Sequence, residues 1–224
     1  MTNFVRCCAL VVVGAILGVA RDAGAQMKVE VSATLGYYSP MGSFTPAEQS
    51  PTFLPSNPGA LSGAALGGEL RVWMSSRIGA QVGATTTSTS FRYEGPMLDV
   101  ASVGGPLPID ESVGPSQVRI SSATAQILYQ VIGSPATARL WLSAGGAAVR
   151  HGGSAYLRFG NPVDYGGALG FGSAFHIKGP LSAELGLTTL IYRMNVTDPN
   201  EPGLNERGTQ VDALFHTGVS YGWH

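Results

Sequence analysis

The segment DALFHTGVSYGWH, residues 212–224, decides the fold that this chain is expected to adopt. Bulky or apolar side chains recur at every second position, and small or polar residues occupy the positions between them. The first set is Phe215, Val219, Tyr221 and Trp223, and the second set is His216, Gly218, Ser220 and Gly222. A strand in a soluble core does not need this pattern, whereas a strand with lipid on one side and a polar barrel interior on the other does. The segment therefore predicts a membrane-spanning strand.

The same two-residue period recurs along the chain. In MKVEVSATLGYY, residues 27–38, Val31 and Leu35 share one face while Glu30 and Thr34 share the other. Alternation over about ten residues is typical of a strand that is apolar on one face only. On this basis strands are predicted at about 27–38, 63–74, 77–94, 117–132, 139–151, 163–178, 181–194 and 209–223.

The connections between these strands point to a closed barrel. All 14 prolines lie outside the predicted strands, as expected because proline removes a hydrogen bond from a sheet. Long links near 39–62 and 94–116 alternate with short links such as SSR and KGP, and outer-membrane barrels alternate long loops with short periplasmic turns in this way. We therefore expect an all-β fold, an eight-stranded antiparallel up-and-down transmembrane β-barrel.

The first residues have the pattern of a targeting segment. Arg6 precedes the apolar run CCALVVVGAILGVA, and Ala23 to Ala25 form an A-x-A cleavage signature. We expect a signal peptide over 1–25 and a barrel domain over 26–224. Both cysteines would leave with the signal peptide, so neither a disulfide nor a cysteine site is expected in the exported protein.

Composition excludes several functional classes. Loss of Arg6, Arg21 and Asp22 would change the formal net charge from −1 to −2, which does not favour nucleic-acid binding. No ordered set of metal ligands is apparent, and no motif suggests a cofactor. The sequence therefore predicts neither a catalytic residue, nor a cofactor, nor a metal site.

Two strands leave the orientation of their side chains open. Val118 and Ile120 differ in phase from the later apolar residues of their strand, so we expect a bulge near Ser121–Ser122. In the next strand, Leu140 and Leu142 compete with Trp141 for the outer face.

Aromatic residues fall near the ends of the predicted strands. The three tryptophans Trp73, Trp141 and Trp223 are expected at the periplasmic rim. The opposite rim is expected to hold Tyr37, Tyr38, Phe91, Tyr93, Tyr165 and Tyr192. Two aromatic belts separated by an aliphatic band would anchor a barrel at both membrane interfaces.

Charged residues on the inner faces form the candidate site. By alternation, the residues that point into the lumen are Lys28, Glu30, Glu69, Arg71, Arg119, Lys178, Glu184 and Asp212. An eight-stranded interior is only wide enough to be filled by side chains, and buried charges must be paired. We therefore expect a charge network that plugs the barrel.

The chain resembles the small outer-membrane β-barrel family that includes the OmpA transmembrane domain and OmpX. The resemblance is carried by VSYGWH and by the hairpin YGGALGFGSAFHIKGPLSAELGLTTLIY. It implies that Tyr221 and Trp223 form the signal read by the barrel-assembly machinery, although His224 follows where family members usually end on the aromatic residue. Family membership would not imply one activity, because members serve as anchors, adhesins, enzymes or narrow channels.

The predicted function is a non-enzymatic outer-membrane role, either in envelope structure or in surface contact. The expected partners are outer-membrane lipid and lipopolysaccharide and, during insertion, the assembly machinery; an extracellular ligand of the long loops stays open. One alternative is a narrow gated pore. A second is a lipid A-modifying enzyme, because His151 and Ser154 in RHGGS resemble part of a deacylase site, although they alternate onto opposite faces of an extended chain.

Overall fold

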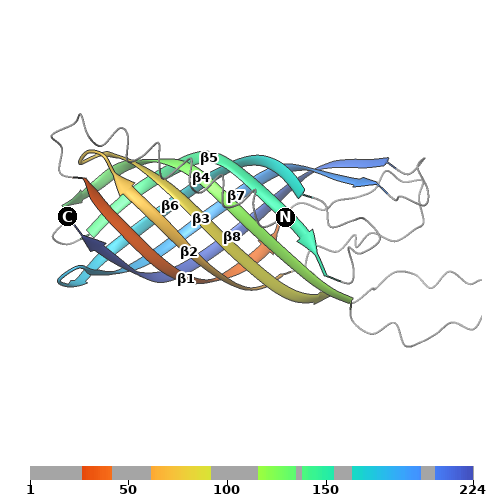
Figure 1. Ribbon diagram of the computed structural model, residues 1–224, viewed down its shortest axis with the longest axis horizontal. Coiled ribbons are helices and arrows are strands. Elements are labelled where there is room, and N and C mark those ends of the chain that lie inside the picture. Colours follow the sequence, from red (N-terminus) through yellow and green to blue (C-terminus); the bar gives the residue numbers. More distant parts are fainter. Residues whose placement is uncertain are drawn as a thin grey trace, which may run out of the picture.

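The chain folds as one closed β-barrel of eight strands (Figure 1). The computed structural model describes residues 27–41, 62–91, 116–134, 138–153, 163–197 and 205–223. The strands are β1 (Lys28–Pro40), β2 (Gly63–Trp73), β3 (Ile78–Phe91), β4 (Ser116–Ser134), β5 (Ala138–Gly152), β6 (Val163–Lys178), β7 (Leu181–Thr197) and β8 (Asn205–Trp223). Within the described ranges there is no helix long and apolar enough to cross a membrane. The predicted fold class is confirmed.

Each strand pairs antiparallel with its neighbours in the sequence. The barrel is closed by β1 and β8, which pair from Val29 opposite Trp223 to Pro40 opposite Asp212. Strand β1 thus extends to Pro40, two residues beyond its predicted end. Proline is tolerated there because pairing with β2 has already ended at Tyr38. The ladder with β8 continues beyond it, since Met41 N donates a 2.7 Å hydrogen bond to Val211 O.

The strand ends joined by short connections lie at one end of the barrel, and the strand ends joined by long connections lie at the other (Figure 1). The β2–β3 turn is closed by a 2.9 Å hydrogen bond from Met74 N to Ile78 O. The β6–β7 turn contains Gly179, whose positive φ of 57° favours glycine. We call this end the turn end and the opposite end the loop end. The signal peptide predicted over 1–25 and most of the long connections lie outside the described residues.

The distribution of side chains is the reverse of that in a soluble protein. Large apolar side chains cover the outer surface, where Leu66 and Ile127 are 62% and 67% exposed. Charged and polar side chains such as Arg71 and Glu184 are buried in the interior. An outer apolar band around a polar interior is the arrangement required of a barrel that crosses a bilayer.

Two groups of apolar side chains share the interior with the charges. The larger group is composed mainly of residues nearer the loop end and includes Tyr38, Val118, Ile120 and Tyr192. The smaller group consists of Trp73, Leu128, Trp141 and Ala174. Of the tyrosines predicted to form a belt at this end, Tyr37 and Tyr165 are exposed outside, whereas Tyr38 and Tyr192 are buried within.

The predicted bulge near Ser121–Ser122 is wrong. Strands β3 and β4 pair without interruption from Ile78 opposite Tyr129 to Phe91 opposite Ser116. The irregularity lies instead between Gln130 and Ile132, where β4 pairs with β5. Val118 and Ile120 point inward in the regular alternation of β4, because the barrel interior at their level is itself apolar.

Candidate functional site inside the barrel

Arg71 is the centre of a buried charge network. Its side chain projects from β2 into the lumen and is 1% exposed. The guanidinium forms ion pairs with Glu184 on β7 and with Glu69, at 2.8 Å, and lies 3.5 Å from Glu30 on β1. Its Nε donates a 3.0 Å hydrogen bond to Gln81 on β3. Arg71 therefore connects side chains from four strands.

A second arginine forms an ion pair with a residue on the opposite wall of the lumen. Arg139 on β5 lies 2.6 Å from Glu30 on β1, measured from Nη2 to Oε1. In the closed order β1 to β8, β5 is four strands from β1 in either direction, so the two strands face each other. Lys28 also contacts Glu30, at 3.0 Å. Arg139 was not predicted as a site residue, although it alternates in phase with Trp141 and would have followed from the correct phase of β5.

Trp73 and Trp141 lie inside the barrel, so their predicted place in a membrane-facing rim is wrong. They are 4% and 5% exposed, and their rings meet edge to face at 6.2 Å. The Trp73 indole N–H donates a 3.1 Å hydrogen bond to Glu30. Arg71 lies 4.7 Å from the ring centroid of Trp141, and Arg139 lies 5.5 Å from that of Trp73. The interior thus provides a hydrogen-bond acceptor and cations that the lipid face would lack.

We call Lys28, Glu30, Glu69, Arg71, Arg139 and Glu184 the lumen ion-pair cluster. Its three formal positive charges match its three carboxylates, as burial of charge requires. Next to this cluster, His216 Nε2 lies 3.7 Å from Glu69. Gln126 extends the polar layer by donating a 3.1 Å hydrogen bond to Ser143. Paired charges and aromatic rings from opposite strands thus meet one another inside the lumen.

Asp212 lies in the lumen nearer the loop end, in a second polar group. It is fully buried and accepts hydrogen bonds from Tyr192, at 2.7 Å, and from Gln210, at 2.8 Å. The Tyr192 hydroxyl lies 3.1 Å from His151 Nε2, and His151 Nδ1 lies 3.3 Å from Asp164. His151 therefore faces the interior, while Ser154, its partner in the deacylase hypothesis, lies outside the described residues. Sequence reasoning did not assign Asp164 or Tyr192 to this group.

Two residues predicted in the lumen are exposed instead. Arg119 points outward because Val118 and Ile120, its neighbours in β4, are buried in the apolar part of the interior. Lys178 lies exposed at the tip of the β6–β7 hairpin, after a break in the register between His176 and Lys178. Among the residues that the structure describes, no group of three acidic, histidine or cysteine side chains could hold a metal ion.

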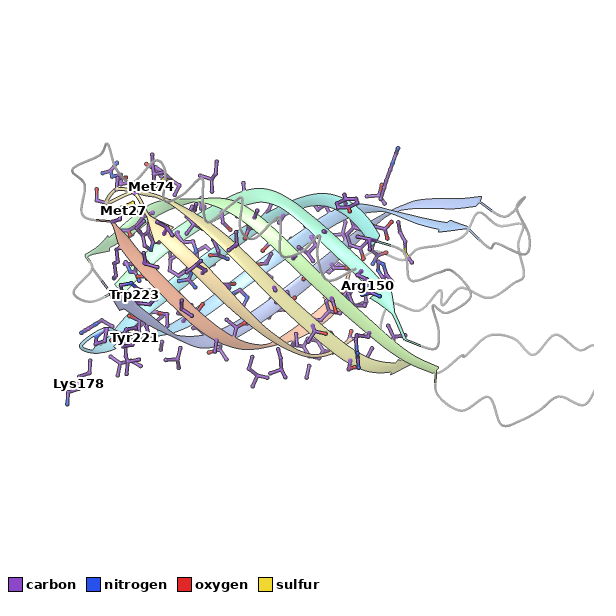
Figure 2. All side chains as sticks on the ribbon, in the orientation of Figure 1. Met27, Met74, Arg150, Lys178, Tyr221 and Trp223 are labelled. Atoms are coloured by element: carbon purple, nitrogen blue, oxygen red, sulfur yellow. The ribbon has the colours of Figure 1, made fainter. Side chains whose placement is uncertain are left out.

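Tyr221 and Trp223 occupy the outer face of β8 at the turn end. Their side chains are 51% and 45% exposed, and the ring centroids are 5.9 Å apart. Their strand pairs with β1 through Val31 and Val29. Figure 2 shows both side chains at the end of the barrel that also carries Lys178 and Met74.

Comparison with known proteins relates this chain to others by structure. Neither a protein-family model nor a curated protein matches it in sequence. The outer membrane protein OprG from Pseudomonas aeruginosa has a TM-score of 0.55 at 12% identity, covering 88% of this chain and 96% of that chain. The outer membrane protein AlkL, solved in lipid bilayers, has a TM-score of 0.51 at 13% identity, covering 91% and 93%. This chain therefore has the fold of the small outer-membrane β-barrels.

Proposed function

We propose that this chain is an outer-membrane barrel with a closed lumen, which serves the envelope structurally or through contacts of its loop end. The ion pair between Glu30 and Arg139 carries this proposal. Its two residues come from strands on opposite sides of the barrel, so the pair spans the lumen. An eight-stranded barrel leaves little space beyond what side chains fill.

The energetics of the lumen ion-pair cluster favour a closed state at rest. To open a path, water would have to separate buried ions or displace Trp73 and Trp141 from their positions beside the arginines. Breaking a buried ion pair by removing one partner typically costs about 3–5 kcal/mol. Because Arg71 has three carboxylate neighbours, opening would disturb several such contacts together.

The outer surface supports an outer-membrane location. The apolar band on the outside fits a bilayer, and barrels of this fold place their short turns in the periplasm. In this proposal the chain is exported by its N-terminal segment, and Tyr221 and Trp223 are read by the assembly machinery. Its partners are outer-membrane lipid and lipopolysaccharide, and its loop end faces the cell exterior, where a ligand of the long loops would bind.

A narrow gated pore is the second candidate. It is favoured by the sharing of Arg71 among Glu30, Glu69 and Glu184, because a shared cation can exchange partners. Such an exchange would open a charged path along the lumen without leaving the guanidinium unpaired.

Conductance of the refolded exported chain in a planar bilayer distinguishes the two candidates. We expect no discrete channels from the unaltered protein, and a measurable conductance from a Glu30→Gln and Arg139→Gln double variant. An Arg77→Gln and Lys178→Gln double variant changes two exposed cations at the turn end and is the matched control. Discrete channels in the unaltered protein would contradict the closed barrel and favour the gated pore.

A further inference from the structure

The charges of this barrel are sorted by sign between its two faces. Among the residues whose side chains the structure describes, every aspartate and glutamate lies in the interior. The exposed charged side chains in the same ranges are all cations, namely Arg77, Arg119, Arg150, Lys178 and Arg193. A random placement of charges for solubility would not produce this separation, so the outer cations require their own explanation.

Three of these cations lie together at the loop end. Arg77 lies in the β2–β3 turn and Lys178 is the last residue of β6, both at the turn end. The other three, Arg119, Arg150 and Arg193, lie on the parts of β4, β5 and β7 near the loop end. Figure 2 shows Arg150 at the end of the barrel opposite Lys178, Tyr221 and Trp223.

The strand register brings the first two arginines close together. Arg119 pairs with Gly152, and Arg150 pairs with Ser121, so the two arginines are diagonal neighbours on one outer face. Diagonal neighbours of this kind are about 7–8 Å apart, within reach of two long side chains. One phosphate group could therefore contact both guanidinium groups.

The third arginine continues the same outer surface. Arg150 pairs with Val163 on β6, and Tyr165 follows two residues later on the same outer face. Gly166 on β6 pairs with Tyr192 on β7. The next residues toward the loop end are Tyr165 on β6 and Arg193 on β7, so these two lie opposite each other on neighbouring strands. We call Arg119, Arg150 and Arg193 the arginine arc; it extends over four adjacent strands, with the 68% exposed Tyr165 between its last two members.

The height of the arc corresponds to a membrane interface. Tyr129 lies on the same face of β4 near the turn end. With a rise of about 3.4 Å per residue and a strand tilt of about 40°, Arg119 lies about 25 Å above Tyr129 along the barrel axis. The apolar band of such barrels is about 25 Å tall. The arc therefore lies at the edge of the hydrocarbon layer, at the level of lipid headgroups.

Among the residues whose side chains the structure describes, none of the three arginines forms an ion pair or a side-chain hydrogen bond, and every carboxylate lies on the inner face. Their charge is thus not neutralised by these neighbours. Guanidinium groups match phosphate in geometry and bind it through paired hydrogen bonds. The Tyr165 hydroxyl adds a donor at the same level.

We propose that the arginine arc is a binding site for the phosphate groups of a glycolipid in the outer leaflet of the outer membrane. Barrels of this fold place their short turns in the periplasm, so the loop end, which carries the arc, lies in the outer leaflet. The negative phosphate groups complement the positive charge of the arginines. The headgroup of such a lipid also lies at the same depth in the bilayer as the arc. The proposal rests on the outer-membrane location proposed above, but it is independent of whether the lumen conducts.

Lipid binding to the purified, refolded barrel tests the site. Native mass spectrometry would measure affinity for diphosphorylated lipid A, for dephosphorylated lipid A and for phosphatidylglycerol, with inorganic phosphate as a competitor. We expect the tightest binding for diphosphorylated lipid A, and at least tenfold weaker binding by the triple variant Arg119→Gln, Arg150→Gln, Arg193→Gln. The triple variant with lysine at the same three positions should retain most of the affinity, since it keeps the charge.

The matched control removes two outer cations at the other end, with Arg77→Gln and Lys178→Gln, and should leave lipid A binding unchanged. Heat-modifiable migration in gels verifies that each variant is folded. Equal affinity for phosphorylated and dephosphorylated lipid A, an unaffected glutamine triple variant or an equal loss in the control would overturn the proposal. Complete displacement by equimolar inorganic phosphate would also overturn it, because the site would then be specific for free phosphate rather than for a lipid.

Discussion

The carboxylate of Glu30 and the guanidinium of Arg139 meet across the barrel, with 2.6 Å between Oε1 and Nη2. Glu30 belongs to β1 and Arg139 to β5, which is the strand farthest from β1 in the closed order. The Trp73 indole donates to the same carboxylate and lies under the same guanidinium. Glu30 thus joins opposite walls of the lumen, and the proposed closure of the lumen depends on this contact.

Replacement of Arg71 by leucine should destabilise the barrel strongly. The substitution leaves Glu69 and Glu184 without their main counter-charge in a buried site, and we expect a loss of about 3–5 kcal/mol in the free energy of unfolding. Denaturant-induced unfolding in lipid vesicles measures this change. Arg77→Leu removes an exposed cation and should change the same quantity by less than about 0.5 kcal/mol. Equal unfolding free energies for the two variants would contradict a structural role of the cluster.

The three tryptophans should differ in their access to lipid. Trp223 lies on the outer surface, whereas Trp73 and Trp141 are buried inside. In variants that keep one tryptophan each and carry phenylalanine at the other two positions, brominated lipid chains should quench the fluorescence of Trp223 and leave that of Trp73 and Trp141 largely unchanged. Strong quenching of Trp141 by lipid would show that the phase of β5 is reversed.

Two adjacent glycines on β5 should respond differently to a single methyl group. A Cβ added at Gly145 would clash with the Ala125 carbonyl oxygen, whereas one at Gly146 would meet nothing nearer than 3.9 Å. Gly145→Ala requires a shift of the β4 backbone, at a cost of about 1–3 kcal/mol or more. We therefore expect a reduced yield of heat-modifiable barrel for Gly145→Ala and an unchanged yield for Gly146→Ala. The opposite order would show that the strands are closer together at Gly146.

The aromatic pair at the end of β8 should be needed for assembly beyond its contribution to packing. We expect that Tyr221→Ala with Trp223→Ala, and also deletion of Tyr221 to His224, prevent the appearance of folded barrel in the outer membrane. The matched control is Ile78→Ala with Tyr129→Ala, a cross-strand pair of similar exposure at the turn end. If the control and the β8 variant assemble equally well, these two aromatics do not form a signal.

Sequence reasoning was accurate where the signal is local. The alternation in residues 27–38 and 212–224 predicted strands, and the predicted inner positions of Glu30, Glu69, Arg71 and Glu184 coincide with the lumen ion-pair cluster. The predicted faces were wrong where both faces of a strand carry apolar residues. Val118 and Ile120 were assigned to the lipid face, so Arg119 was assigned to the lumen by the same error.

The number, order and approximate limits of the strands follow from the sequence alone. Each depends only on a two-residue period and on the residues that interrupt it, both of which are properties of neighbouring positions. The tertiary structure decided that Trp73 and Trp141 turn inward and that Arg139 meets Glu30. Those orientations depend on partners brought together from the opposite wall of the barrel, because an indole N–H and a buried charge are stable only where closure supplies an acceptor and a counter-ion.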